Sequence, residues 1–246
     1  MVLRILTTLL ITSLWCGAAD YQIANKESNG LQIVTDSLIT SDWTNTVLWI
    51  TANSPIVNSG STNATWPCYA KNCGGNLIQP TLSSQPARLT TNGIKIIKFD
   101  GIDDNITTPV GWSNTIKKVE FVYYSPTAIT KTSGGRAVYG LPGSSAYGFY
   151  IGQSTGVFSN EVLNLVYEST SVAAYLDDGT NGISAGFHKY SVVWSGTKWN
   201  IFLDDVNVTT TNIANINIPL TGIFVGGRGS AGFYIDGGLQ YLWMSK

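Results

Sequence analysis

The alternation of hydrophobic and polar residues is the strongest pattern in this 246-residue chain. No segment keeps the 3.6-residue apolar spacing of an amphipathic helix, whereas short runs with period-two alternation recur between clusters of Gly, Asn, Asp, Ser and Pro. The pattern predicts an all-β protein built as a two-sheet antiparallel β-sandwich or jelly roll. The predicted strands are Ile94–Phe99, Thr115–Tyr124, Arg136–Tyr139, Tyr147–Gly152, Leu163–Tyr167, Val172–Leu176, His188–Trp194, Lys198–Leu203, Ile213–Ile218, Ile223–Gly226 and Leu239–Met244.

The clearest local signal is a hairpin. The alternating runs His188–Trp194 and Lys198–Leu203 flank the three-residue loop Ser195-Gly196-Thr197, which contains the glycine that such loops favour. Asp204-Asp205 follows directly, and two short polar residues that tolerate left-handed backbone predict a second tight turn.

Charge is sparse along the chain. Charged residues make up 12% of the sequence, where soluble domains carry roughly 25%. The net charge of -1 and the single histidine, His188, argue against a nucleic-acid binder, which needs a strongly basic face. We expect no membrane span, because no apolar run reaches the roughly 18 residues that a spanning helix needs.

The first twenty residues have the pattern of a secretory signal peptide. Arg4 supplies a positive charge, Ile5–Trp15 is an apolar stretch, and Gly17-Ala18-Ala19 offers small residues at a cleavage point. The alternative is a buried N-terminal helix or strand. We therefore divide the chain into a signal peptide at 1–19, a lead-in segment or added edge strand at 20–42, and one domain at 43–246, and we expect a secreted protein.

Cleavage after Ala19 would leave two cysteines, Cys68 and Cys73, five positions apart. An even number of cysteines in an exported chain favours a disulfide, here one that closes a short surface loop. The alternative is half of a zinc site, which the absence of further Cys or a nearby His disfavours.

Four segments together resemble a known superfamily. They are Leu48-Trp49-Ile50-Thr51-Ala52, Phe99-Asp100-Gly101-Ile102-Asp103-Asp104, the hairpin region from Phe187 to Asp205, and Ile223-Phe224-Val225-Gly226-Gly227-Arg228. In order and spacing they resemble the concanavalin A-like lectin/glucanase superfamily, in particular its laminin-G-like jelly-roll branch, from about Trp43 to Met244. The resemblance implies two face-to-face antiparallel sheets, with carbohydrate bound in many members and calcium in some. The same fold serves lectins, glycosidases, adhesion modules and virion proteins, so function has to be argued from the site.

The sequence gives little support to catalysis. Glycoside hydrolysis uses two carboxylates on either side of the scissile bond, which the glucanase branch places as Glu-x-Asp-x-Glu. None of the four glutamates has that spacing, and Glu120, which strand alternation places on the same face as Lys118, is interpreted as a salt-bridged surface residue. We expect His188 to be structural, because no Gly-x-Ser-x-Gly elbow accompanies it. The sequence therefore predicts a protein that is not an enzyme.

Pairs of aspartates at predicted turns are the candidate metal ligands. Calcium binds six to eight oxygens, which loop carboxylates and carbonyls supply. Asp is also a preferred turn former, because its side chain bonds neighbouring backbone amides, and this explains the same pairs without a metal. Asp204-Asp205 is already accounted for by the hairpin. The candidate ligands of a structural calcium ion are Asp103, Asp104, Asp177 and Asp178.

Loop aromatics are the candidate sugar-binding residues. A sugar lays an apolar face on an exposed ring while polar groups bind its hydroxyls, and aromatic residues make up 11% of this chain. We expect Trp49, Trp194 and Trp243 in the core. The candidate ligand-binding residues are Trp66 and Tyr69 in the cystine loop, Trp112 after a predicted turn, and Tyr147 and Tyr150.

These observations lead to one principal functional hypothesis, an exported, non-catalytic, lectin-like module that binds a glycan or glycosylated surface. The alternative is a structural subunit of an extracellular filament, cell-surface or virion assembly, which self-associates through edge strands. A glycoside hydrolase or lyase ranks third. A surface poor in charge and rich in Ser, Thr and Asn suits both of the first two hypotheses.

Overall fold

A computed structural model describes residues 44–53, 57–59, 63–70, 72–130, 135–141, 147–152, 161–167, 170–176, 182–210, 218–227 and 233–246. They belong to one compact unit, Asp42–Lys246. The predicted signal peptide and lead-in segment lie outside the described residues. None of the described residues forms a helix of the length and hydrophobicity needed to cross a membrane.

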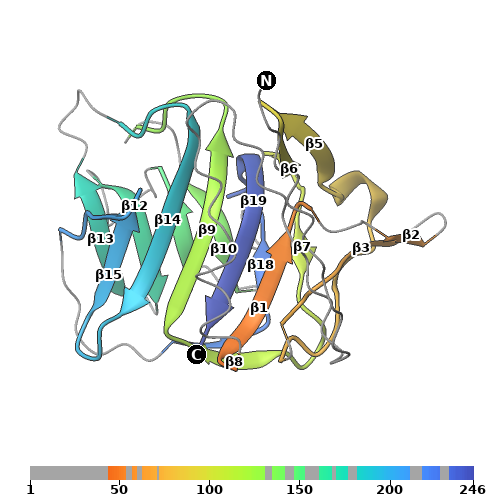
Figure 1. Ribbon diagram of the computed structural model, residues 1–246, viewed down its shortest axis with the longest axis horizontal. Coiled ribbons are helices and arrows are strands. Elements are labelled where there is room, and N and C mark those ends of the chain that lie inside the picture. Colours follow the sequence, from red (N-terminus) through yellow and green to blue (C-terminus); the bar gives the residue numbers. More distant parts are fainter. Residues whose placement is uncertain are drawn as a thin grey trace, which may run out of the picture. The chain divides into compact units, whose positions relative to one another are not determined.

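The described chain folds into two large antiparallel sheets that form a sandwich, which confirms the all-β prediction (Figure 1). The strands are β1 (Thr46–Thr51), β2 (Val57–Ser59), β3 (Asn63–Trp66), β4 (Leu77–Gln79), β5 (Ala87–Thr91), β6 (Ile94–Asp100), β7 (Ile106–Thr107), β8 (Ser113–Ile116), β9 (Lys118–Ser125), β10 (Arg136–Gly140), β11 (Tyr147–Ile151), β12 (Glu161–Tyr167), β13 (Thr170–Leu176), β14 (Gly186–Trp194), β15 (Trp199–Leu203), β16 (Val206–Asn207), β17 (Ile218–Thr221), β18 (Phe224–Val225) and β19 (Asp236–Ser245). A short 3-10 helix, η3, spans Leu82–Ser84.

The first sheet has eight strands in the order β16-β15-β14-β9-β19-β6-β5, and β1 also pairs with β19. The second sheet has nine strands in the order β13-β12-β11-β10-β18-β7-β4-β3-β2. The last strand in sequence, β19, is therefore central, since it pairs with β9 along one side and with both β6 and β1 along the other. We call the two large layers the eight-stranded and the nine-stranded sheet.

Alternating residues of both sheets meet in a core that is rich in aromatic rings. Phe121 of β9 stacks on Tyr190 of β14 at a centroid distance of 5.0 Å, and both rings belong to the eight-stranded sheet. The edge of Phe149, from β11 of the nine-stranded sheet, meets Phe121 at 5.4 Å. All three side chains are fully buried. Aromatic pairs of this geometry stabilise a fold by about 0.5–1.5 kcal/mol beyond the burial of their area. The contact between Phe149 and Phe121 therefore stabilises the packing of the two sheets directly.

The predicted hairpin is confirmed. Strands β14 and β15 pair antiparallel from Tyr190↔Leu203 to Trp194↔Trp199. Asp204 and Asp205 both have positive φ, at 48° and 66°, and connect β15 to β16 by the tight turn that the sequence predicted.

One predicted strand divides in two. The run Thr115–Tyr124 is interrupted at Lys117. Before this residue, β8 pairs with β17 in a separate two-stranded sheet, and after it, β9 belongs to the eight-stranded sheet. The backbone of Lys117 donates to Ser245 and accepts from Trp194, so it is fixed between two strands as the chain changes direction. The hydrophobic pattern continues across this break, which is why the sequence suggested one strand.

The disulfide prediction is confirmed, because Cys68 and Cys73 are bonded and close the loop that follows β3. The backbone N–H of Tyr69, inside this loop, donates to the carbonyl of Trp49 on β1 at 3.0 Å. The loop is therefore joined to the sandwich by a backbone hydrogen bond as well as by its crosslink.

Gly226 allows a close contact within the core, and its replacement by alanine tests that packing. A Cβ at this position would overlap the ring of Phe99, and its φ of 94° adds backbone strain. Gly196 in the hairpin loop has the same φ, yet nothing lies within 4 Å of its Cβ position. We expect Gly196→Ala to cost about 1 kcal/mol from φ alone and Gly226→Ala about 1–3 kcal/mol more, measured by chemical denaturation. Equal losses in the two variants would contradict the packing of Phe99 on Gly226.

Candidate functional site: an acidic loop at the end of β6

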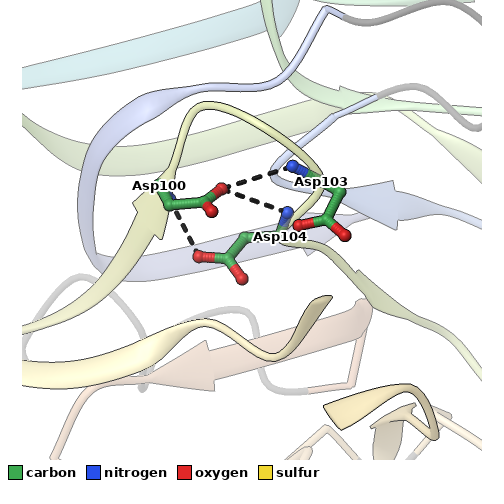
Figure 2. Close-up of side chains that lie close together, drawn as sticks. All are labelled: Asp100, Asp103 and Asp104. Carbon is green, nitrogen blue, oxygen red and sulfur yellow. Dashed lines mark hydrogen bonds between the residues drawn. The ribbon is translucent and has the colours of Figure 1, made fainter. Parts of the chain in front are cut away.

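Three aspartates come together where β6 ends. Asp100 is the last residue of β6, and Asp103 and Asp104 lie in the loop that follows, as Figure 2 shows. One carboxylate oxygen from each can be chosen so that all three lie within 4.8 Å of one another. We call Asp100, Asp103 and Asp104 the acidic loop.

Side-chain hydrogen bonds to the backbone fix the shape of this loop. Oδ1 of Asp100 accepts the backbone N–H groups of Ile102 at 2.8 Å, Asp103 at 3.3 Å and Asp104 at 3.4 Å. In return, Oδ2 of Asp104 accepts the N–H of Asp100 at 2.8 Å, so the two ends of the loop bond each other (Figure 2). The turn-forming interpretation of the aspartates therefore holds for Asp100, an aspartate that is not among the predicted metal ligands.

The loop is also held from outside. Oδ2 of Asp103 accepts the hydroxyl of Ser84, at the end of η3, at 2.8 Å. Gly101 has a φ of 80°, and a Cβ there would lie 2.9 Å from Cβ of Asp236 on β19. Close approach to β19 therefore requires glycine at this point of the loop.

The pKa values of Asp104 and Asp100 are shifted in opposite directions. Burial, together with the negative charges of Asp100 and Asp103, raises the pKa of Asp104 to about 6. Burial raises the pKa of Asp100, but the hydrogen bonds from the backbone N–H groups of Ile102, Asp103 and Asp104 together have the larger effect, so the pKa is lowered. At neutral pH the loop therefore carries several negative charges close together, and the ionisation of Asp104 is the one that destabilises the folded state.

The lysine that acts on Asp104, Lys98, forms an ion pair with a different carboxylate, that of Asp236. Nζ of Lys98 lies 2.6 Å from Oδ1 of Asp236 and donates to the carbonyl of Phe99 at 2.7 Å. Asp236 is the register partner of Asp100 across β6 and β19. Lys98 lowers the pKa of Asp104 only as the last of several contributions, so the charge of the acidic loop is not neutralised by this ion pair.

The residues of the acidic loop fit a hard divalent cation such as calcium. Asp100 and Asp104 each use one carboxylate oxygen in the loop's own hydrogen bonds, and Asp103 uses one to accept the hydroxyl of Ser84. The second oxygen of each accepts no hydrogen bond from the described residues. Three oxygens are fewer than the six to eight that calcium takes, so carbonyls and water would complete the set. Of the four predicted ligands, Asp103 and Asp104 are brought together, whereas Asp177 and Asp178 lie outside the described residues.

The predicted aromatic sugar platform is wrong for three of its five residues. Trp66 is 1% exposed, Trp112 5% and Tyr150 1%, so none offers an exposed ring face. Trp66 and Trp112 belong to the core, where the indole N–H of Trp112 donates to the carbonyl of Val47 at 3.3 Å. Their positions next to proline or after a turn indicated loops, but their side chains point inward.

The other two aromatic candidates differ in what the structure says of them. Tyr69 is half-buried in the cystine loop and contacts the ring of Trp49 at a centroid distance of 5.5 Å. The side chain of Tyr147 lies outside the described residues. Among the tryptophans expected in the core, Trp49 and Trp194 pack against it, while Trp243 is buried beneath the ammonium group of Lys118, which lies 4.8 Å from its ring.

Glu120 is paired as predicted but is not a surface residue, since only 6% of it is exposed. It lies 3.7 Å from Nζ of Lys118 and 4.0 Å from Nζ of Lys189. Its other oxygen accepts the hydroxyl of Tyr241 at 2.8 Å, and burial followed by the charge of Glu120 raises the pKa of that tyrosine. Neighbouring strands cover Glu120 with long side chains, which alternation along one strand does not reveal.

His188 has more partners than the sequence suggested. Its Nδ1 lies 2.7 Å from Oδ2 of Asp204, and its Nε2 lies 3.0 Å from both the hydroxyl and the carbonyl oxygen of Ser184. Asp204 is held in turn by the backbone N–H of Lys189 at 2.9 Å. Because Nε2 bridges the side chain and the backbone of Ser184, we interpret the group as a tie between the start of β14 and the turn after β15.

Comparison with known proteins identifies the fold but no family. No family model matches the sequence, and no curated protein matches it. Among solved structures, domain 4 of AbnA, a GH43 extracellular arabinanase from Geobacillus stearothermophilus, solved in complex with arabinotriose, matches with a TM-score of 0.55 and 11% identity. The match covers 82% of this chain and 92% of that domain. This likeness is one of fold, and it supports the assignment of a two-sheet β-sandwich.

Two further solved structures match less well. The sialidase of Trypanosoma rangeli, in complex with the inhibitor DANA, has a TM-score of 0.47 and 9% identity, over 80% of this chain and 30% of the sialidase. A glycoside hydrolase family 16 endo-glucanase from Bacteroides ovatus has a TM-score of 0.37 and 15% identity, over 80% of this chain and 92% of the enzyme.

The raised pKa of Asp104 predicts a specific pH dependence. The folded state binds the proton more tightly than the unfolded state, so ionised Asp104 costs stability above about pH 6, and this cost disappears as the pH falls below about 4. Without divalent cations, Asp104→Asn should therefore be more stable than the original chain by about 1–2 kcal/mol at pH 7.5 and equally stable near pH 3.5. Urea denaturation at the two pH values measures this.

The matched control for this experiment is Asp205→Asn, which removes an exposed carboxylate at the distant hairpin turn. We expect it to show no such gain at pH 7.5. An Asp104→Asn variant that is less stable than the original chain at pH 7.5 would contradict the electrostatic account of the loop.

Proposed function

We propose that this protein is an exported carbohydrate-binding module with no glycosidase activity of its own. The observation that carries the proposal is the likeness to domain 4 of the arabinanase, which extends over 92% of that domain and was solved with arabinotriose bound. A sandwich of this size, sparse in charge and rich in Ser, Thr and Asn, suits binding of uncharged hydroxyl-rich ligands, because few ionised groups have to be desolvated.

The environment of Glu120 supports a role without glycoside hydrolysis. A glycosidase needs two carboxylates facing the scissile bond, about 5–10 Å apart. Glu120 is buried, and both of its oxygens are engaged by Tyr241, Ser191 and two lysines. Its position therefore favours holding β9, β14 and β19 together over proton transfer to a ligand.

The acidic loop supports a structural calcium ion as part of this proposal. Asp100, Asp103 and Asp104 would hold the ion and balance their mutual repulsion with its charge. Because Ser84 and Asp236 contact the same loop, an ion there would stiffen the connection between η3, β6 and β19.

Export is supported by two features. The signal-peptide pattern at 1–19 directs a chain to secretion, and the bonded Cys68–Cys73 pair is compatible with an oxidising, extracellular location.

A second candidate function, a subunit of an extracellular assembly, is favoured by one feature. Strand β5 forms an edge of the eight-stranded sheet, and Leu89 on it is 48% exposed. An exposed edge strand with an apolar side chain is a template for pairing with another chain. In this alternative, copies of the chain associate through their β5 strands.

Binding of purified protein to an immobilised glycan array tests the principal proposal. We expect binding to one or more neutral oligosaccharides, with arabino-oligosaccharides among those tested, and no release of reducing sugar from them on prolonged incubation. Size-exclusion chromatography of the same sample gives its oligomeric state. Large particles together with no glycan binding would favour the assembly alternative.

The calcium proposal predicts a rise in melting temperature with calcium chloride relative to EDTA at pH 7.5. A ligand at one hundred times its Kd stabilises by about 2.7 kcal/mol, which is about 5–10 °C for a domain of this size. Asp104→Asn should lose most of the rise although it is more stable in EDTA, and Asp205→Asn should keep it. An unchanged melting temperature and no heat of binding in calorimetry would remove the calcium claim.

A further inference from the structure

Three segments of the chain, which begin at Asn63, Asn105 and Asn207, carry the Asn-x-Thr motif of N-linked glycosylation in exported proteins. The motif alone indicates only a candidate, because a glycan is bulky and hydrophilic and the folded chain has to leave room for it. The side chain of Asn63 lies outside the described residues. The other two asparagines have opposite environments.

Asn207 lies on the surface, at one end of the eight-stranded sheet. It is exposed and is the last residue of β16, the strand with which the described order of this sheet begins. The tight turn at Asp204 and Asp205 leads the chain from β15 into this edge strand. A group attached to Asn207 would therefore lie at the margin of the sheet rather than within the core.

The hydrogen bonds of Asn207 are compatible with an attached sugar. Its Oδ1 accepts the backbone N–H of Thr209, the threonine of the motif, at 3.0 Å, and glycosylation leaves this oxygen unchanged. Its Nδ2 donates to Oδ1 of Asn200 at 3.5 Å, which is longer than the usual range of about 2.7–3.2 Å. A glycosylated amide keeps one N–H for this weak bond, and the sugar replaces the other hydrogen, which has no acceptor among the described residues.

Asn105 carries the same motif in an environment that has no room for a glycan. It is 7% exposed, its Oδ1 accepts Nε2 of Gln79 at 2.7 Å, and its Nδ2 donates to the carbonyl of Asp103 at 2.8 Å. A sugar on this Nδ2 would disrupt the packing around the side chain and displace the acidic loop, to which the bond to Asp103 joins it. A chain modified at Asn105 therefore does not reach the fold described above.

We propose that Asn207 is the attachment site of an N-linked glycan and that Asn105 stays unmodified in the folded protein. The inference rests on the export part of the proposed function, because the sugar donor belongs to the export pathway. In the transfer, Nδ2 of Asn207 attacks the anomeric carbon of a sugar carried on a lipid pyrophosphate. The bond from that carbon to the phosphate oxygen breaks, the lipid pyrophosphate leaves, and Nδ2 gives up one proton as the C–N bond forms.

A glycan at Asn207 would shield one edge of the eight-stranded sheet. Val206, the other residue of β16, is 63% exposed, and an exposed apolar residue on an edge strand favours pairing with another chain. A bulky, hydrophilic glycan one residue away hinders that approach. Strand β5, at the other end of the strand order, contains no Asn-x-Thr motif. Glycosylation therefore disfavours self-association through β16 and leaves β5 unaffected.

Expression of the full chain in cultured mammalian cells tests the proposal. One version keeps residues 1–19, and a second has a signal peptide of the host in their place. Protein from the medium and from the cells is treated with peptide-N-glycosidase in heavy-oxygen water, which converts each glycosylated asparagine to a labelled aspartate. Peptide mass spectrometry then locates the label. We expect label at Asn207 and none at Asn105 in the secreted protein.

Two glutamine variants are the matched controls. Asn207→Gln should lose one glycan, seen as a faster band in gel electrophoresis, and should self-associate more strongly than the glycosylated chain in analytical ultracentrifugation. Asn105→Gln should keep that glycan and have a lower melting temperature, because it disturbs the hydrogen bonds with Gln79 and Asp103.

Absence of label at Asn207 from both versions, in medium and cells alike, would overturn the glycan site and leave the carbohydrate-binding proposal intact. Label at Asn105 in the secreted protein would overturn the selection between the two sites. Equal self-association of Asn207→Gln and the glycosylated chain would overturn the shielding of β16. Label at Asn207 only in the version with the host signal peptide would overturn export by residues 1–19 and uphold the site itself.

Discussion

The contact of Phe149 with Phe121 and Tyr190 is the interaction on which the rest of the structure depends. It crosses from the nine-stranded to the eight-stranded sheet, and it sets the position of β11 relative to β9 and β14. On the outer side of β9 lies the pair of Glu120 and Lys118, and beside Phe149 on the outer side of β11 lies Tyr150. Because side chains alternate along a strand, packing these rings inward dictates which residues the two outer faces receive.

The acidic loop and the buried side chain of Asn164 illustrate two different costs. In the loop, like charges are held close together by backbone hydrogen bonds, and the protein pays through the raised pKa of Asp104. At Asn164 the cost is an unpaired neutral amide. A cation or a proton would relieve the first cost, whereas only a hydrogen-bonding group would relieve the second, so the two costs are chemically independent.

The sequence predicted those parts of the structure that local pattern determines. Period-two alternation identified the β14–β15 hairpin, and turn chemistry identified the left-handed pair Asp204-Asp205. Asp103 and Asp104 were found because they are adjacent and acidic, whereas Asp100 was not, because it is not part of an adjacent pair of aspartates. Its inclusion in the Phe99–Asp104 motif was the signal that could have identified it.

Burial on an outer face could not be predicted in the same way. Trp66 and Trp112 occur next to turn-forming residues, yet tertiary packing turns both rings into the core. Asn164, between two leucines, fits a strand with one solvated face, and only the fold shows that this face is covered. Ser184 is four residues before His188 in no recognisable motif, and the course of the chain into β14 brings the two together.

The central position of β19 has a consequence for how the chain acquires its fold. Residues 236–245 pair with β9 on one side and with β6 and β1 on the other. A chain that emerges from a ribosome or a translocation pore N-terminus first therefore presents β9 and β6 with unpaired edges until nearly all of the sandwich has emerged. Unpaired edges of this kind can pair with other chains, so β9 and β6 are open to intermolecular pairing until β19 is in place.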